Sequence, residues 1–192
     1  MGKLNLKLPF SRLEEYVNLF YTGDLKKNEY GLEKVLGLRL GNELKLEEFA
    51  IKRLENQADF LQQDFSVQSV FDMSNKNSNI LERWGGKRCL LFGDSYEFYS
   101  PNLNETYKLE LNSKDVFAIP SVFEESNQNL SAFMFKHHNT FYETKGIEIE
   151  VPVIFSKSTA GDWLNQNLGL NQLLYLLEQR QVFSQELRIK SI

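Results

Sequence analysis

The stretch that decides the fold is residues 87–155, where six strand-like runs follow one another: KRCLLF (87–92), SYEFYS (95–100), TYKLEL (106–111), VFAIP (116–120), LSAFMFKHH (130–138) and IEIEVPVIF (147–155). In the third run Tyr107, Leu109 and Leu111 alternate with Lys108 and Glu110, which indicates a strand with one buried and one solvated face. Turn-forming residues separate the runs, and Gly93-Asp94 has the composition of a two-residue hairpin turn. The stretch therefore predicts one continuous antiparallel meander.

Helical patterns dominate on both sides of this stretch. Residues 11–21 carry an apolar stripe with Ser11 as a candidate cap, and residues 43–64 repeat apolar side chains every seven positions from Leu44. Residues 24–41 favour a helix, with a short strand over the alternating LGLRL (36–40) as the alternative. After residue 155 two helices are expected, one capped by Ser156 or Ser158, followed by a short strand at residues 186–189.

Together these patterns predict an α+β fold. An antiparallel meander sheet of about five to seven strands, from residues 87–155 plus the short C-terminal strand, is flanked by N-terminal and C-terminal helices. The length of 192 residues fits a single domain. Within it, residues 1–80 could form a helical subdomain packed on the sheet of residues 87–192.

Composition narrows the functional classes. The net charge of −4 and the pI of about 5.4 are poorly suited to phosphate backbones, so no nucleic-acid partner is expected. The single cysteine, Cys89, cannot form an internal disulfide and lies in an apolar run typical of a buried side chain. The N-terminus has no signal-peptide pattern and no apolar run spans a membrane, so the sequence predicts a cytoplasmic protein.

Few residues are candidates for a catalytic or metal-binding role, because phosphate-binding glycine loops, nucleophile elbows and HExxH motifs are all absent from the sequence. The two histidines, His137 and His138, are consecutive on a predicted strand and so face opposite sides, which disfavours a shared metal. Glu143 and Lys145 give half of a metal-dependent nuclease site, which would need a second carboxylate such as Asp115 or Glu124. We expect neither metal nor cofactor, and these four residues are the only catalytic candidates.

Aromatic and acidic side chains offer an interaction surface instead. Tyr96, Phe98, Phe141 and Tyr142 lie near predicted turns and are candidate binding residues, with a purely structural core role as the alternative. Three acidic pairs could face a basic partner: Glu14-Glu15, Glu47-Glu48 and Glu124-Glu125.

The sequence thus favours a non-enzymatic cytosolic protein that binds another protein, such as an accessory subunit or a toxin-neutralising protein of the immunity or antitoxin kind. The alternative is an enzyme or small-ligand-binding protein with a pocket on the aromatic-rich sheet, in which His137, His138, Glu143 or Lys145 would be the polar groups. A metal-dependent nuclease is the least favoured form of that alternative.

Overall fold

The structure is a computed structural model that describes residues 2–19, 35–40, 44–51, 86–100, 102–126, 129–138, 150–179 and 186–192. The helices within them are α1 (Phe10–Val17), α5 (Lys157–Trp163) and α6 (Leu170–Gln179). The strands are β1 (Gly2–Asn5), β2 (Val35–Arg39), β3 (Lys45–Ile51), β4 (Arg88–Gly93), β5 (Ser95–Ser100), β6 (Glu105–Leu111), β7 (Phe117–Ser126), β8 (Asn129–Met134), β9 (Lys136–His138), β10 (Glu150–Pro152) and β11 (Leu187–Ser191). Mostly antiparallel strands with two helices near the C-terminus confirm the α+β class.

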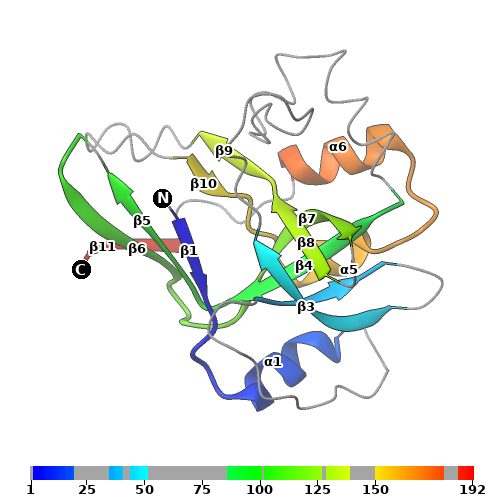
Figure 1. Cartoon of the computed structure of the whole chain (residues 1–192), viewed down its shortest axis with the longest axis horizontal. Coiled ribbons are helices and arrows are strands. Elements are labelled where there is room, and N and C mark those ends of the chain that lie inside the picture. The colour runs from blue at the N-terminus through cyan, green and yellow to red at the C-terminus, as the bar shows by residue number, and fades with distance from the viewer. Residues whose placement is uncertain are drawn as a thin grey trace.

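The predicted single meander is wrong, because its strands are divided between separate sheets (Figure 1). A closed barrel has the order β2-β3-β8-β7-β4, with only the β3–β8 pair parallel. A four-stranded antiparallel sheet has the order β1-β5-β6-β11, and β9 pairs with β10. The two ends of the chain therefore form the two edges of one sheet.

The division occurs at Gly93-Asp94, which is a corner between sheets and not the predicted hairpin turn. A Cβ atom on Gly93 would lie 2.4 Å from Leu4 Cδ1 and 3.1 Å from the Asn5 carbonyl oxygen, so a larger residue would require Leu4 and β1 to shift. The Asp94 N–H donates to the Asn5 carbonyl at 2.9 Å, and the Asp94 carboxylate accepts from the N–H groups of Lys7 and Leu8. Contacts with β1, which is distant in sequence, thus redirect the chain after β4.

The N-terminal half also differs from expectation. Residues 45–51 form β3, so the helix predicted over residues 43–64 is wrong there, and its remainder from residue 52 lies outside the described residues. The helix favoured for residues 24–41 is likewise wrong over Val35–Arg39, where the alternative strand is confirmed. β2 and β3 pair with each other, and Arg39 forms an ion pair with Glu47 across them at 2.6 Å. Strand pairing of this kind overrides weak helical propensity.

Other local predictions are confirmed. The stripe of α1 buries Leu13, Tyr16 and Val17, although the helix begins at Phe10 and Ser11 makes no cap. β5 and β6 form a hairpin through residues 102–104. Ser156 caps α5 by accepting the Thr159 N–H at 3.4 Å. No helix in the described part of the chain has the length and apolar character needed to cross a membrane.

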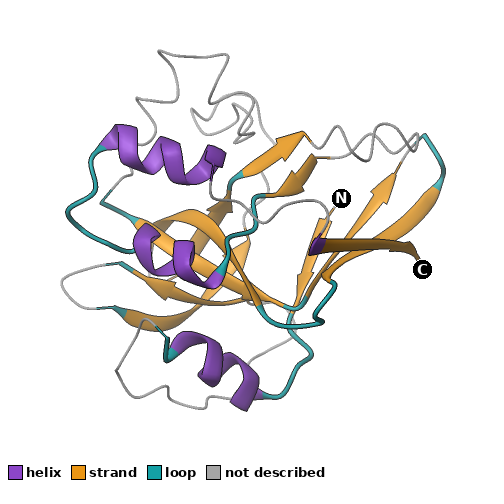
Figure 2. Cartoon of the chain, turned by 180° about the vertical axis from the view of Figure 1, so that it is seen from behind, coloured by secondary structure: helices purple, strands orange, loops and turns teal. Residues whose placement is uncertain are grey.

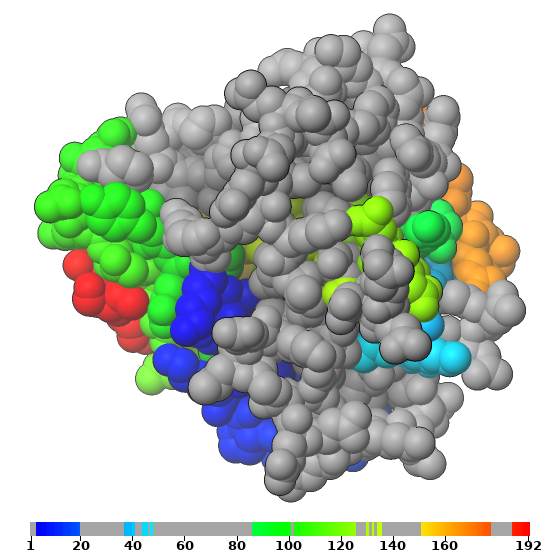
Figure 3. Space-filling model, viewed as in Figure 1, coloured from blue at the N-terminus to red at the C-terminus, as the bar shows by residue number. Residues whose placement is uncertain are grey.

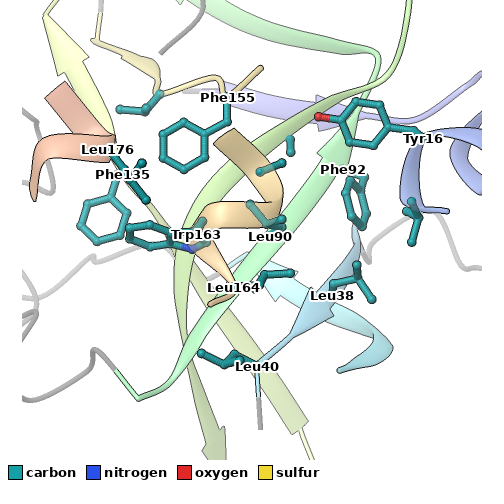
Figure 4. Packing of buried hydrophobic residues seen from close by; sticks show 14 of the residues in the cluster. Tyr16, Leu38, Leu40, Leu90, Phe92, Phe135, Phe155, Trp163, Leu164 and Leu176 are labelled. Carbon is teal, nitrogen blue, oxygen red and sulfur yellow. The ribbon is translucent and has the colours of Figure 1, made fainter. Parts of the chain in front are cut away.

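Two hydrophobic cores lie on opposite faces of β4 and β7. Leu90, Phe92, Ala118 and Val122 face α1, α5 and α6, and we call this the helix-side core (Figures 2 and 4). The alternating positions, including Cys89, Leu91, Phe117 and Ile119, face the four-stranded sheet and make the sheet-side core. Because both faces are covered, these strands read as continuous apolar runs.

Candidate functional site

Two of the four candidate catalytic residues lie in the described part of the chain. His137 pairs with Val151 and His138 with Glu150, which places both histidines on β9 beside β10. Glu143, Lys145, Phe141 and Tyr142 lie outside the described residues. Of the carboxylates considered for a nuclease site, Asp115 forms an ion pair with Lys157 at 3.2 Å. The described residues contain no group of three His, Cys, Asp or Glu side chains that could hold a metal ion.

Tyr96 and Phe98 do not form an exposed binding surface, which corrects the prediction for these two residues. Their exposed fractions are 2% and 4%, and both belong to the sheet-side core. Their rings stack at 6.2 Å, and Phe98 stacks in turn on Tyr107 at 5.8 Å. Proximity to a turn does not expose them, because their positions on β5 point toward the barrel.

The acidic pairs are partly occupied by internal contacts. Arg39 binds Glu47 at 2.6 Å and Glu125 at 3.2 Å, and its guanidinium lies 5.4 Å from the centroid of the Phe123 ring. Glu15 pairs with Arg12 on the exposed face of α1. Side chains from two of the three pairs thus hold barrel strands together, which leaves less acidic surface for a basic partner.

Charged side chains instead gather on the outer face of the four-stranded sheet. Directly opposed residues share a face, and the register aligns Lys3 with Glu97, Glu97 with Lys108, and Lys108 with Lys190. The row crosses all four strands. The neighbouring row on this face pairs Glu110 with Arg188.

Glu110 is the electrostatic centre of this face. Its carboxylate accepts from Lys108 at 3.0 Å, from Lys190 at 3.3 Å and from the Arg188 Nε at 3.0 Å. Its side chain is only 7% exposed. Burial alone would raise the pKa of Glu110, but hydrogen bonds from Arg188, Lys108 and Lys190 outweigh that effect and lower the pKa to about 2.

We define the cationic sheet face by these residues and by Lys7, whose ammonium lies 3.9 Å from Glu97. Its members are Lys3, Lys7, Glu97, Lys108, Glu110, Arg188 and Lys190. Five cations therefore stand against two carboxylates in a chain whose net charge is −4. Figure 3 shows that the segments carrying the cationic sheet face lie together on one side of the molecule. They are blue at the N-terminus, green over β5 and β6, and red at the C-terminus.

Glu110 should make the free energy of unfolding depend on pH in the acidic range. Its folded pKa of about 2 lies below its unfolded value of 4.5, so its contribution is fully present above pH 4.5 and is lost as pH falls toward 2. The full shift corresponds to about 3 kcal/mol, and we expect about 2 kcal/mol because water screens the half-exposed Arg188 and Lys190. Urea unfolding of Glu110→Gln at pH 7 should show this loss, and the difference from wild type should shrink toward pH 2.

Glu15→Gln is the matched control, since Glu15 is exposed and pairs only with Arg12 among the described residues. It should change the free energy of unfolding by less than about 0.5 kcal/mol at every pH. A Glu110→Gln deficit that stays constant between pH 7 and pH 2 would contradict the assignment.

Known proteins match this chain in fold alone. No protein-family model and no curated protein matches the sequence. A phage-related protein from Bordetella bronchiseptica has a similar structure, with a TM-score of 0.72, 10% identity, and coverage of 100% of this chain and 94% of that protein. A second B. bronchiseptica protein has a TM-score of 0.59 and 12% identity over 100% of this chain and 98% of its own. A Bacteroides thetaiotaomicron protein has a TM-score of 0.55 and 12% identity, with coverage of 83% of this chain and 73% of its own. The chain therefore shares its fold with proteins from at least two bacterial genera.

Proposed function

We propose that this chain is a non-enzymatic binding protein whose cationic sheet face docks an acidic segment of another protein. The observation that carries the proposal is the excess of five cations over two carboxylates on one face of an acidic chain. Complementary charge across an interface speeds encounter and selects the partner.

The arrangement leaves cationic groups available to a partner. Glu110 lies beneath Lys108, Lys190 and Arg188, so its charge is shared among three cations. Lys3 and Lys7 at the other edge are exposed and face only Glu97 among the charged residues of this face. Three strand spacings of about 4.8 Å separate the edges, so the row suits an acidic segment about four or five residues long.

A protein partner fits this face better than a nucleic acid does. Single-stranded nucleic acids are bound by several aromatic rings on which bases stack. On the outer face of the described four-stranded sheet the exposed aromatic side chain is Tyr99, at 44%. The net charge of −4 also opposes the approach of a long phosphate backbone.

Charge reversal tests the proposal with a defined probe, a fluorescent octapeptide of glutamate, followed by anisotropy at low salt. Wild type should bind saturably and lose affinity as salt is added. Lys3→Glu with Lys190→Glu should weaken binding roughly tenfold or more, because each reversal turns an attraction into a repulsion.

The matched control reverses Lys45 and Lys114, two exposed lysines outside the cationic sheet face, and gives the same net charge. It should bind nearly as well as wild type. Equal loss in both double variants would show only a net-charge effect and would overturn the proposal. Tighter binding of a twelve-residue oligothymidylate than of the peptide would replace the protein partner by a nucleic acid.

A further inference from the structure

A separate cavity of about 380 Å³ lies where α1, the turn between β6 and β7, and the start of α5 meet. Its lining includes Tyr16 from α1, Asp115 and Val116 from the turn, Phe155 just before α5, Lys157 at the start of α5, and Glu186 just before β11. This volume is within the range of sites for small organic ligands. The cavity shares no residue with the cationic sheet face.

The floor of the cavity is apolar. Tyr16, Val116 and Phe155 are all buried members of the helix-side core. Burial, aided by the nearby Asp115 carboxylate, raises the pKa of Tyr16, so its ring stays neutral. The floor therefore offers a neutral aromatic surface to the body of a ligand.

Three charged residues of the lining, Asp115, Lys157 and Glu186, are at least partly exposed and so mark the mouth of the cavity. Asp115 is held in place, because one carboxylate oxygen accepts the Val116 N–H at 3.0 Å and the other pairs with Lys157 at 3.2 Å. No ion pair or hydrogen bond occupies the Glu186 carboxylate among the residues that the structure describes. The balance at the mouth is negative.

The position of the Lys157 ammonium shows where a cation can bind in this cavity. It lies 5.5 Å from the centroid of the Tyr16 ring, at cation–π distance, while it pairs with Asp115. Its side chain is 50% exposed, so it can swing into solvent and leave both contacts to another cation. An anionic ligand would reach the same ammonium only beside two carboxylates.

We propose that this cavity binds a small organic cation, an ammonium group attached to an apolar body. The ammonium takes the place of the Lys157 Nζ between the Tyr16 ring and Asp115, and Glu186 adds a second negative charge. The apolar body rests on Val116 and Phe155. The inference goes beyond the proposed docking function and does not depend on it.

Three probes of similar size and different charge test the ligand class: 2-phenylethylammonium, 3-phenylpropionate and 2-phenylethanol. Titration followed by amide chemical shifts in ¹H–¹⁵N spectra should show saturable shifts at residues 112–116 and 157 with the ammonium probe. The carboxylate probe should bind at least tenfold more weakly, and the alcohol between them.

Two exposed substitutions give effects of opposite sign. Glu186→Gln should weaken binding of the ammonium probe roughly threefold or more and leave binding of the alcohol unchanged. Lys157→Met removes the Lys157 ammonium that competes for the site, so it should tighten binding of the ammonium probe roughly threefold. Thermal unfolding checks that both variants are folded. Tighter binding of the carboxylate than of the ammonium, no saturable ammonium binding, or weaker ammonium binding in Lys157→Met would each overturn the proposal.

Discussion

Trp163→Ala is expected to lower the free energy of unfolding by about 4 kcal/mol, the cost of removing a large aromatic side chain from a closed core. Trp163 is fully buried, and its ring makes edge contacts with Phe135 at 5.6 Å and Phe155 at 5.7 Å (Figure 4). Its Nε1–H donates to the Cys89 carbonyl at 3.0 Å, which ties α5 to β4. Urea unfolding followed by far-ultraviolet circular dichroism measures the loss without relying on tryptophan fluorescence.

Two further variants separate the contribution of the buried aromatic ring from that of the indole hydrogen bond and from the effect of removing any aromatic side chain. Trp163→Phe keeps an aromatic ring but loses the indole N–H, so we expect a loss of about 2 kcal/mol. Tyr175→Ala removes an aromatic side chain that is 55% exposed on α6 and should cost less than about 0.5 kcal/mol. A Trp163→Ala loss as small as that of Tyr175→Ala would mean that α5 does not depend on this ring.

Local patterns predicted those parts of the fold whose contacts are near in sequence or repeat regularly. The stripe of α1, the β5–β6 hairpin and the Ser156 cap each depend on residues within a few positions of one another. β11 was predictable as well, because its alternation is clear even though its partner β6 is distant. Such features follow from propensity and periodicity alone.

The division into two sheets could not be predicted in this way, since it depends on distant pairing. Gly93-Asp94 has the composition of a hairpin turn, but β1 occupies the edge of β5, and Asp94 is held by the backbone at the end of β1 and just after it, at residues 5, 7 and 8. Residues 45–51 repeat apolar side chains at helical spacing, yet β2 and β8 provide pairing edges on both sides. Neither edge is visible in the local sequence.

The cationic sheet face was missed for the same physical reason. Runs of adjacent basic residues are the usual sequence signal for a cationic surface, and this face has none. Its lysines at positions 3, 108 and 190 become neighbours only through strand register. A usable signal was present in the polar positions of each alternating strand, where Lys108, Arg188 and Lys190 occur, but their alignment required the strand order.

Arg88→Met is expected to lower the free energy of unfolding by about 3 kcal/mol, because it leaves one buried and one partly buried carbonyl group without their donor. Arg88 is 3% exposed on β4, and its Nε donates to the Trp163 carbonyl at 2.9 Å and its Nη2 to the Asn165 carbonyl at 2.7 Å. These carbonyls lie at the end of α5, where a helix has unsatisfied acceptors and partial negative charge. Methionine keeps much of the apolar stem, so urea unfolding of this variant reports mainly the lost donors.

Matched variants test the role of the forked guanidinium. Arg88→Lys keeps the charge but cannot span both carbonyls, and we expect an intermediate loss of about 1.5 kcal/mol. Arg12→Met removes an arginine that is 59% exposed and should cost less than about 0.5 kcal/mol. Equal stabilities of Arg88→Lys and wild type would show that a point charge suffices at this position.

Arg88 and Trp163 should also be coupled. The Arg88 guanidinium lies 5.8 Å from the centroid of the Trp163 ring while it binds the carbonyl of the same residue, so either substitution disturbs the contacts of the other. The double variant should therefore lose at least 1 kcal/mol less than the sum of the two single losses. Strict additivity would mean that β4 holds α5 through two independent contacts, whereas the expected coupling makes the end of α5 a single unit built on Arg88.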